Sequence, residues 1–141
     1  MIKVSKTKLV SVVGNHSVIS IWDLHTATCL KTISIDKITS CLVKISSSEI
    51  LITQKNIIHL LDISTGNYLK EFIGHNDKIT SVVKLNKTQI ASGERGCIKI
   101  WDLHTNKCLQ TFTDFTRDIT IIEKISNTHI ACLEDSDNIK I

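Results

Sequence analysis

Six histidines, nine aspartates and five cysteines are the residues of this sequence that could perform acid–base, nucleophilic or metal chemistry. Many of them recur at a fixed spacing, which argues against a single catalytic site. His25 and His104 occupy the same place in two copies of one hexapeptide, and Asp23, Asp62 and Asp102 recur beside them. Short polar side chains of this kind cap turns. We therefore expect these histidines and aspartates to be structural.

The five cysteines do not form a recognisable disulfide or zinc pattern, because their number is odd and no Cys-x-x-Cys pair is present. Cys29 and Cys108 are equivalent in the repeat, which indicates packing and not nucleophilic catalysis. Cys41, Cys97 and Cys132 fall in expected strands and receive the same interpretation. The chain also lacks Gly-x-Ser-x-Gly, phosphate-loop and His-Glu-x-x-His motifs. The sequence predicts no enzyme activity, no cofactor and no metal.

The composition favours β-structure. Ile, Val and Thr make up a third of the 141 residues, while Ala is scarce and Pro is absent. Hydrophobic residues account for 42% and charged residues for 22%, a balance that excludes a disordered chain. We therefore expect a folded all-β protein.

A period of about forty residues runs through the chain. The segment that begins at Lys3 recurs at Lys44, Lys84 and Lys124, with offsets of 41, 40 and 40 residues. The hexapeptide 21–26 reappears unchanged at 100–105, and a weaker copy lies at 60–65. Two markers that share one period indicate a repeat protein. The predicted units cover residues 1–35, 36–73, 74–113 and 114–141, which together form one domain.

Each unit contains four strand signals, which the third unit shows most clearly. Its expected strands are 79–85, 89–92, 97–103 and 108–113, separated by polar turns at 86–88, 93–96 and 104–107. A single sheet of such short strands cannot bury both of its faces, so each unit needs a neighbour stacked against it.

These residues resemble the WD40 repeat of β-propeller proteins. Gly74-His75 followed by Trp101-Asp102 fits the repeat, Trp22-Asp23 supplies a second Trp-Asp, and Leu61-Asp62 is a degenerate copy. The resemblance covers essentially the whole chain. It implies an all-β fold of about four four-stranded antiparallel blades.

In WD40 repeats a His, a Ser or Thr, an Asp and the Trp commonly form a buried hydrogen-bonded set. The resemblance gives these roles in the third unit to His75, Ser92 and Trp101, but Arg95 stands where the Asp is expected. The corresponding positions elsewhere are His16, Lys55 and Ser136. We therefore expect an incomplete network in every unit. Phe115 replaces the histidine in the fourth unit, where an apolar wedge could substitute for it.

The last unit stops where its outermost strand would begin, so the chain is expected to form fifteen strands. Family members most often have seven blades, so four blades predict an open arc. Its uncovered faces would need a partner. A fragment of a longer protein, self-association of two chains and an unusually tight closed ring are the alternatives.

The resemblance also predicts where a partner would bind. In a propeller, the loops that enter each blade and the turns between its second and third strands lie on one face, and such loops commonly carry binding residues. Arginine and aromatic side chains are favoured anchors. The expected partner-binding residues are Asp36, Lys37, Asn76, Asp77, Lys78, Glu94, Arg95, Phe115, Thr116 and Arg117.

The predicted function is a non-catalytic WD40 scaffold that binds other proteins or peptides. A remnant without independent function and the substrate-recognition part of a ubiquitin-ligase complex are the alternatives. The net charge is +3 and acids separate the lysines along the chain, so no nucleic-acid partner is expected. No run of about 18 uncharged apolar residues indicates membrane insertion. Unpaired cysteines favour an intracellular, cytoplasmic protein, with the nucleus left open.

Overall fold

The fold was analysed in a computed structural model, which describes residues 1–13, 18–35, 39–135 and 138–140. These residues form fifteen strands in four antiparallel sheets, as the repeat predicts. The first sheet contains β1 (Ile2–Lys3), β2 (Lys8–Val13), β3 (Val18–Asp23) and β4 (Thr28–Ser34); the second contains β5 (Thr39–Lys44), β6 (Glu49–Gln54), β7 (Ile57–Asp62) and β8 (Tyr68–Ile73). The third contains β9 (Ser81–Lys84), β10 (Gln89–Glu94), β11 (Cys97–Asp102) and β12 (Cys108–Phe112); the fourth contains β13 (Ile119–Lys124), β14 (Ile130–Glu134) and β15 (Asn138–Lys140).

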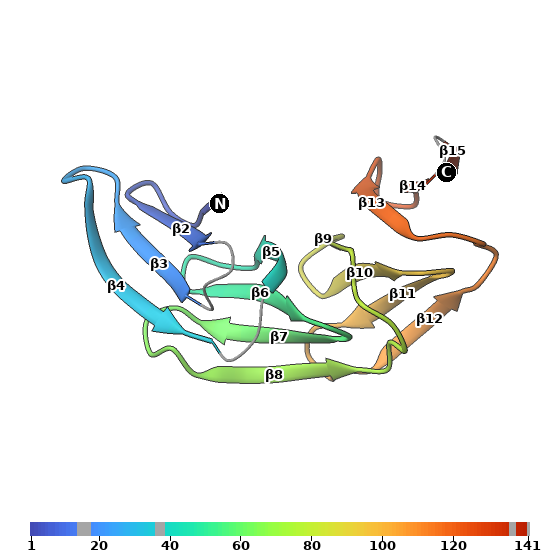
Figure 1. Cartoon of the computed structure of the whole chain (residues 1–141), viewed down its shortest axis with the longest axis horizontal. Coiled ribbons are helices and arrows are strands. Elements are labelled where there is room, and N and C mark those ends of the chain that lie inside the picture. Colours follow the sequence, from blue (N-terminus) through green and yellow to red (C-terminus); the bar gives the residue numbers. More distant parts are fainter. Residues whose placement is uncertain (14–17, 36–38, 136–137, 141) are drawn as a thin grey trace.

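Within every sheet the strands lie side by side in chain order. Figure 1 shows β4, β8 and β12 along the convex side of the molecule, whereas β5, β9 and β13 lie toward its concave side. The four sheets form an open arc with the first and fourth sheets at its two ends (Figure 1). The expected all-β, partial-propeller fold is therefore confirmed.

The core consists of apolar layers between successive sheets, because strand side chains alternate between the two faces of a sheet. Between the first two sheets, Ile19 and Ile21 pack against Ile50 and Ile52. The central strands are the most buried, whereas every residue of the outer strand β12 is exposed. Stacking against a neighbouring sheet thus buries what a single sheet would leave in water.

The repeat extends to irregular backbone features. The pairing of the third and fourth strands shifts register just before Trp22, Leu61 and Trp101, which is the same place in each of the three sheets that show it. The turns that follow have a positive φ at Ala27, Gly66 and Asn106. Equivalent distortions at equivalent positions indicate that the units are copies of one structure.

Candidate functional site

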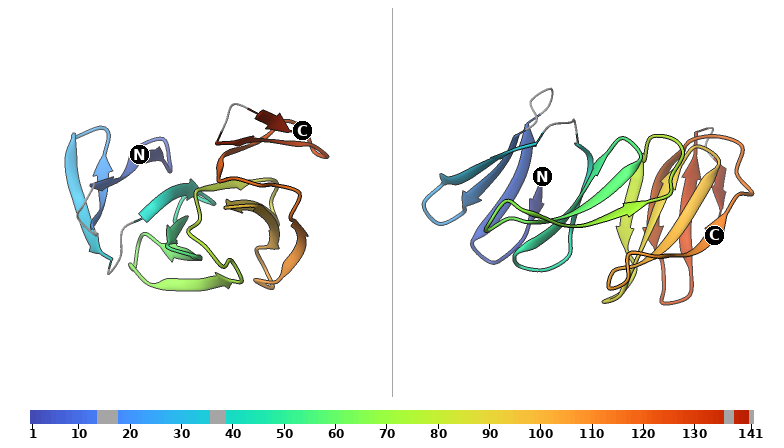
Figure 2. Two further views of the ribbon diagram at one scale, coloured as in Figure 1. Left: turned by 45° about the vertical axis from the view of Figure 1, so that its right-hand side comes forward. Right: turned by 90° about the horizontal axis from the view of Figure 1, so that it is seen from below.

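Backbone hydrogen bonds sort the connections into two opposite faces of the arc. On one face, the segments that enter a sheet lie beside the turns between second and third strands: Ile79 N donates to Lys55 O (2.8 Å) and Gly96 N to Arg117 O (2.9 Å). We call this the loop face; its described residues are 55–56, 74–80, 94–96, 113–118 and 134–135. On the other face, the turns between first and second strands lie beside those between third and fourth strands, as in the 2.8 Å bond from Leu103 N to Thr88 O. We call this the turn face. The right-hand view of Figure 2 shows the hairpin turns gathered at the two ends of the stacked sheets.

Most of the described residues expected to bind a partner are exposed on the loop face. Asn76, Asp77, Lys78, Arg95, Thr116 and Arg117 are exposed there, and Phe115 is half-buried. Asp36 and Lys37 lie outside the described residues. The loop of the fourth sheet is tied down, because Arg117 Nη1 donates to Asp135 O (3.2 Å) and Arg95 pairs through its backbone with Asp118. The structure thus brings Arg95 and Arg117 into neighbouring segments.

Glu94 does not belong to this exposed surface, contrary to the expectation from the sequence. Its side chain is buried, with 3% of the residue exposed, and its carboxylate accepts a hydrogen bond from Asp77 N (2.5 Å). Glu134, forty residues later, is also buried and accepts from Thr116 N and Arg117 N. The two buried carboxylates thus fix the backbone of the loops that lead into the third and fourth sheets. Sequence reasoning missed this role, although Gln54, Glu94 and Glu134 recur at intervals of forty residues.

Glu94 also completes the buried network of the third sheet. Trp101 Nε1 donates to Ser92 Oγ (2.7 Å), which lies 2.6 Å from His75 Nε2, while His75 Nδ1 lies 3.0 Å from a carboxylate oxygen of Glu94. In the matching tautomer Trp101 donates to Ser92, Ser92 donates to His75 Nε2, and Nδ1–H of His75 faces the Glu94 carboxylate at ion-pair distance without reaching hydrogen-bond geometry. The expectation of an incomplete network in every unit is therefore wrong for the third. The carboxylate comes from the end of β10, one residue before Arg95, and the longer Glu side chain reaches the imidazole.

Burial lowers the pKa of His75, and the neighbouring Glu94 carboxylate opposes this effect only in part. The imidazole is therefore neutral near pH 7, since its ordinary pKa already lies at about 6.5. A neutral ring matches the tautomer above, in which Nε2 accepts and Nδ1 carries the proton.

The other sheets retain parts of this network. In the first sheet, Trp22 Nε1 donates to Ser11 Oγ (2.8 Å), but Trp22 is only half-buried. In the second sheet the Trp and Ser positions hold Leu61 and Ile52, both fully buried. In the fourth sheet Phe115 packs against the core layer next to the third sheet, which is consistent with the expected apolar wedge. His16 and Ser136 lie outside the described residues.

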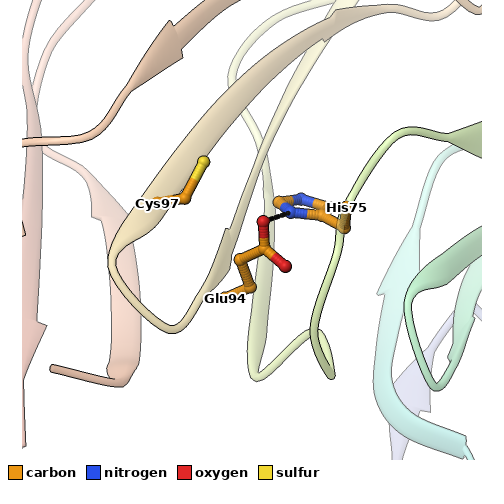
Figure 3. A group of neighbouring side chains, drawn as sticks. All are labelled: His75, Glu94 and Cys97. Atoms are coloured by element: carbon orange, nitrogen blue, oxygen red, sulfur yellow. Dashed lines mark ion pairs between the residues drawn. The ribbon is translucent and has the colours of Figure 1, made fainter.

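Among the described residues, the side chains of His75, Glu94 and Cys97 form a cluster of residue types that could bind a metal ion (Figure 3). Their ligand atoms lie within 4.8 Å of one another, and all three residues are buried. Each imidazole nitrogen already faces a hydrogen-bonding partner, however, and both Glu94 oxygens are engaged by His75 and Asp77. Burial also raises the pKa of the Cys97 thiol, which disfavours the thiolate that a metal needs. The hydrogen-bonded network accounts for this cluster.

None of the five cysteines, all of which lie in the described part of the chain, forms a disulfide. Cys29 and Cys108 are exposed on the outer strands β4 and β12, so the packing role expected for them is wrong. Each thiol instead donates to the carbonyl two residues ahead, Lys31 O and Gln110 O. Within the described residues, no further sheet lies outside the fourth strands β4 and β12 to cover these thiols. Cys97 and Cys132 are buried and Cys41 is half-buried.

The recurring aspartates cap turns, as expected. One carboxylate oxygen of each accepts hydrogen bonds from two backbone N–H groups of the following turn: Asp23 from His25 and Thr26, Asp62 from Ser64 and Thr65, and Asp102 from His104 and Thr105. These backbone hydrogen bonds are the main cause that lowers the pKa of Asp23 and Asp102. The pKa of Asp62 is lowered most by the hydrogen bond from the Ser64 hydroxyl and then by the backbone N–H groups. His25 and His104 take part in the same way in both copies, through their backbone.

A groove of about 450 Å³ lies between the third and fourth sheets, lined in part by Leu109, Phe112, Ser126 and His129. Its Ser126 Oγ lies 3.1 Å from His129 Nδ1, the spacing of a nucleophile and its base. The same hydroxyl accepts from Thr128 N and His129 N, as Ser46 accepts from the equivalent turn in the second sheet. This Ser–His pair is therefore a repeated turn cap.

Comparison with known proteins identifies the fold. Neither a protein-family model nor a curated protein sequence matches the chain. Among solved structures, the WD40 β-propeller domain of Doa1 superposes with a TM-score of 0.86 at 21% identity, over 96% of this chain and 47% of that domain. The computationally designed Ika4 protein gives 0.82 at 22% identity over 84% of its chain, and the designed Ika8 protein gives 0.80 at 22% over 42%.

The chain thus has the WD40 β-propeller fold and spans about half the length of the Doa1 domain. No helix among its described residues is long and apolar enough to cross a membrane.

Proposed function

We propose that this chain is a non-catalytic scaffold that binds another protein or a peptide through its loop face. The WD40 propeller fold supports a protein-interaction role, because propellers of this kind generally bind other proteins. The buried glutamates carry the specific proposal: Glu94 and Glu134 fix the backbone of the loops that display Lys78 and Arg117. Arg95 is held beside them by its backbone pairing with Asp118. Loops held in one conformation lose less entropy on binding.

Arg95 and Arg117 are the proposed anchors. They are the only arginines of the sequence, and both are exposed on neighbouring segments. A guanidinium presents several donors in a planar fork, and Arg is favoured at binding hot spots. Since none of the five cysteines forms a disulfide in the described part of the chain, we place the protein in a reducing, intracellular compartment.

Affinity capture from cell extract with the wild type and the R95A/R117A variant tests the proposal. The K107A variant is the control, because Lys107 is exposed on the turn face and its side chain makes no hydrogen bond within the described part of the chain. We expect partners bound by the wild type and by K107A to be lost with R95A/R117A. Full retention by the double variant would remove the loop face as the binding surface. Aggregation and rapid proteolysis of the wild type would favour a remnant without function.

Self-association is a second proposal for the faces of the first and fourth sheets that no other sheet covers within the described residues. Trp22 is half-buried there and Leu24 and Ile121 are exposed, with 44% and 49% of their surface accessible. Light scattering of the purified chain distinguishes a monomer from a pair.

A further inference from the structure

Four lysines occupy equivalent positions in the four sheets. Lys3, Lys44, Lys84 and Lys124 are each the last residue of the first strand of a sheet. Each pairs with the equivalent apolar residue of the next strand: Leu9, Ile50, Ile90 and Ile130, respectively. Because the register is the same in all four sheets, these lysines follow the concave inner edge of the turn face. We call them the lysine rim.

The adjoining turns add to this positive charge. Lys6, Lys8 and Lys87 lie in the same hairpins, so that segments 3–9, 44–50, 84–90 and 124–130 contain seven lysines and one acid, Glu49. Six of the seven lysines are exposed, and Lys84 is half-buried. The described residues of the loop face, in contrast, hold four cations and six acids. The fold thus brings together on the turn face lysines that are separated by acidic residues along the sequence.

The rim lysines lack carboxylate partners. Lys84 Nζ donates to Ile45 O (2.6 Å) and Lys124 Nζ to Asn127 Oδ1 (3.1 Å), both uncharged acceptors. Among the described residues, no carboxylate lies within 4 Å of any of the four lysines. The three turn-capping aspartates share this face, but each uses its carboxylate for backbone N–H groups, and only Lys8 lies directly opposite one of them, Asp23.

We propose that the lysine rim binds an acidic, extended segment of a partner protein, independently of the loop face. Lysine ammonium groups are compact point charges and can pair with successive carboxylates. The partner is recognised by charge complementarity, which also speeds association.

The residue types favour a protein over a nucleic acid. The four hairpin segments contain no Phe, Tyr or Trp on which a base could stack and no arginine to read a base edge.

Fluorescence anisotropy tests this proposal with a labelled synthetic peptide of twelve residues that alternates Glu with Gly and Ser. We compare the wild type with K3Q/K44Q/K124Q, and with K55Q/K78Q/R95Q, which removes the same charge from the loop face. Three exposed ion pairs correspond to a roughly 3- to 150-fold change in Kd, so we expect weakening in this range for the rim variant and less than about twofold for the control. Thermal unfolding followed by circular dichroism verifies that both variants fold.

Equal weakening by the two triple variants would overturn the proposal, because it would reflect net charge alone. Failure of the peptide to bind the wild type, or tighter binding of a single-stranded RNA or of phosphatidylserine vesicles, would also overturn it. Loss of partners with R95A/R117A does not bear on this site, since the two surfaces lie on opposite faces.

Discussion

Replacement of Trp101 by Ala tests how the third sheet is stabilised. Only 1% of Trp101 is exposed; its ring meets Phe72 edge-on, with centroids 6.0 Å apart, and Nε1 donates to the buried Ser92. A buried aromatic side chain removes roughly 150–250 Å² from water, which at about 25 cal/mol/Å² corresponds to about 4–6 kcal/mol. Relaxation of neighbours reduces such costs, so we expect a loss of roughly 3–5 kcal/mol.

The chain offers a matched control in Trp22. It belongs to the same hexapeptide and donates to Ser11 as Trp101 does to Ser92, but it is only half-buried. W22A should therefore cost about half as much, on the order of 2 kcal/mol. The two variants differ in burial and not in the hydrogen bond that each loses.

Urea unfolding followed by far-UV circular dichroism measures both changes, since this signal does not depend on tryptophan fluorescence. W101F retains an apolar ring and loses the hydrogen bond and part of the indole volume, so it should fold and remain measurable if W101A does not. Equal losses for W22A and W101A, or a loss below about 1 kcal/mol for W101A, would refute the assignment of stability to burial.

Two further predictions concern the same region. G93A should destabilise the chain by about 1–3 kcal/mol, because the added Cβ would lie 2.8 Å from Ile119 Cγ2 at the boundary between the third and fourth sheets. A free energy of unfolding in urea equal to that of the wild type would contradict this prediction. Because the folded-state pKa of His75 is lowered, the unfolded chain binds the extra proton first, so stability should be full above about pH 6.5 and fall below it. Because a single proton is involved, the unfolding free energy should change by at most about 1.4 kcal/mol per pH unit from this cause. The H75Q variant should lose this contribution to the pH dependence of the unfolding free energy.

The repeat made the fold predictable from the sequence. Two markers with one period located the strands closely: the expected strands 89–92 and 97–103 are observed as β10 (Gln89–Glu94) and β11 (Cys97–Asp102). The turn-capping role of Asp102 also followed from recurrence alone. A periodic pattern reports what each unit shares, and the shared features are those that form the sheets.

The candidate site was less predictable because it depends on what individual side chains reach. The motif assigns the network carboxylate to position 95, whereas Glu94 supplies it from the preceding strand residue. The exposure of Cys29 and Cys108 was missed for a related reason: equivalence shows that two residues share an environment but not whether another sheet covers it. How far a side chain reaches, and whether another sheet covers it, both depend on the tertiary structure and cannot be read from the repeat alone.

The charge of the turn face is such a property as well. Along the sequence, Lys3, Lys44, Lys84 and Lys124 are about forty residues apart and are separated by acids. A repeat of that length returns the chain to the same hairpin of the next sheet, so residues one period apart become neighbours around the arc. The intervening acids fall largely at other phases of the repeat, where Glu94 and Glu134 support the loop face and Asp23, Asp62 and Asp102 cap turns. Phase within the period, and not overall composition, therefore places the four rim lysines along the same edge of the turn face, where we expect an acidic partner to bind.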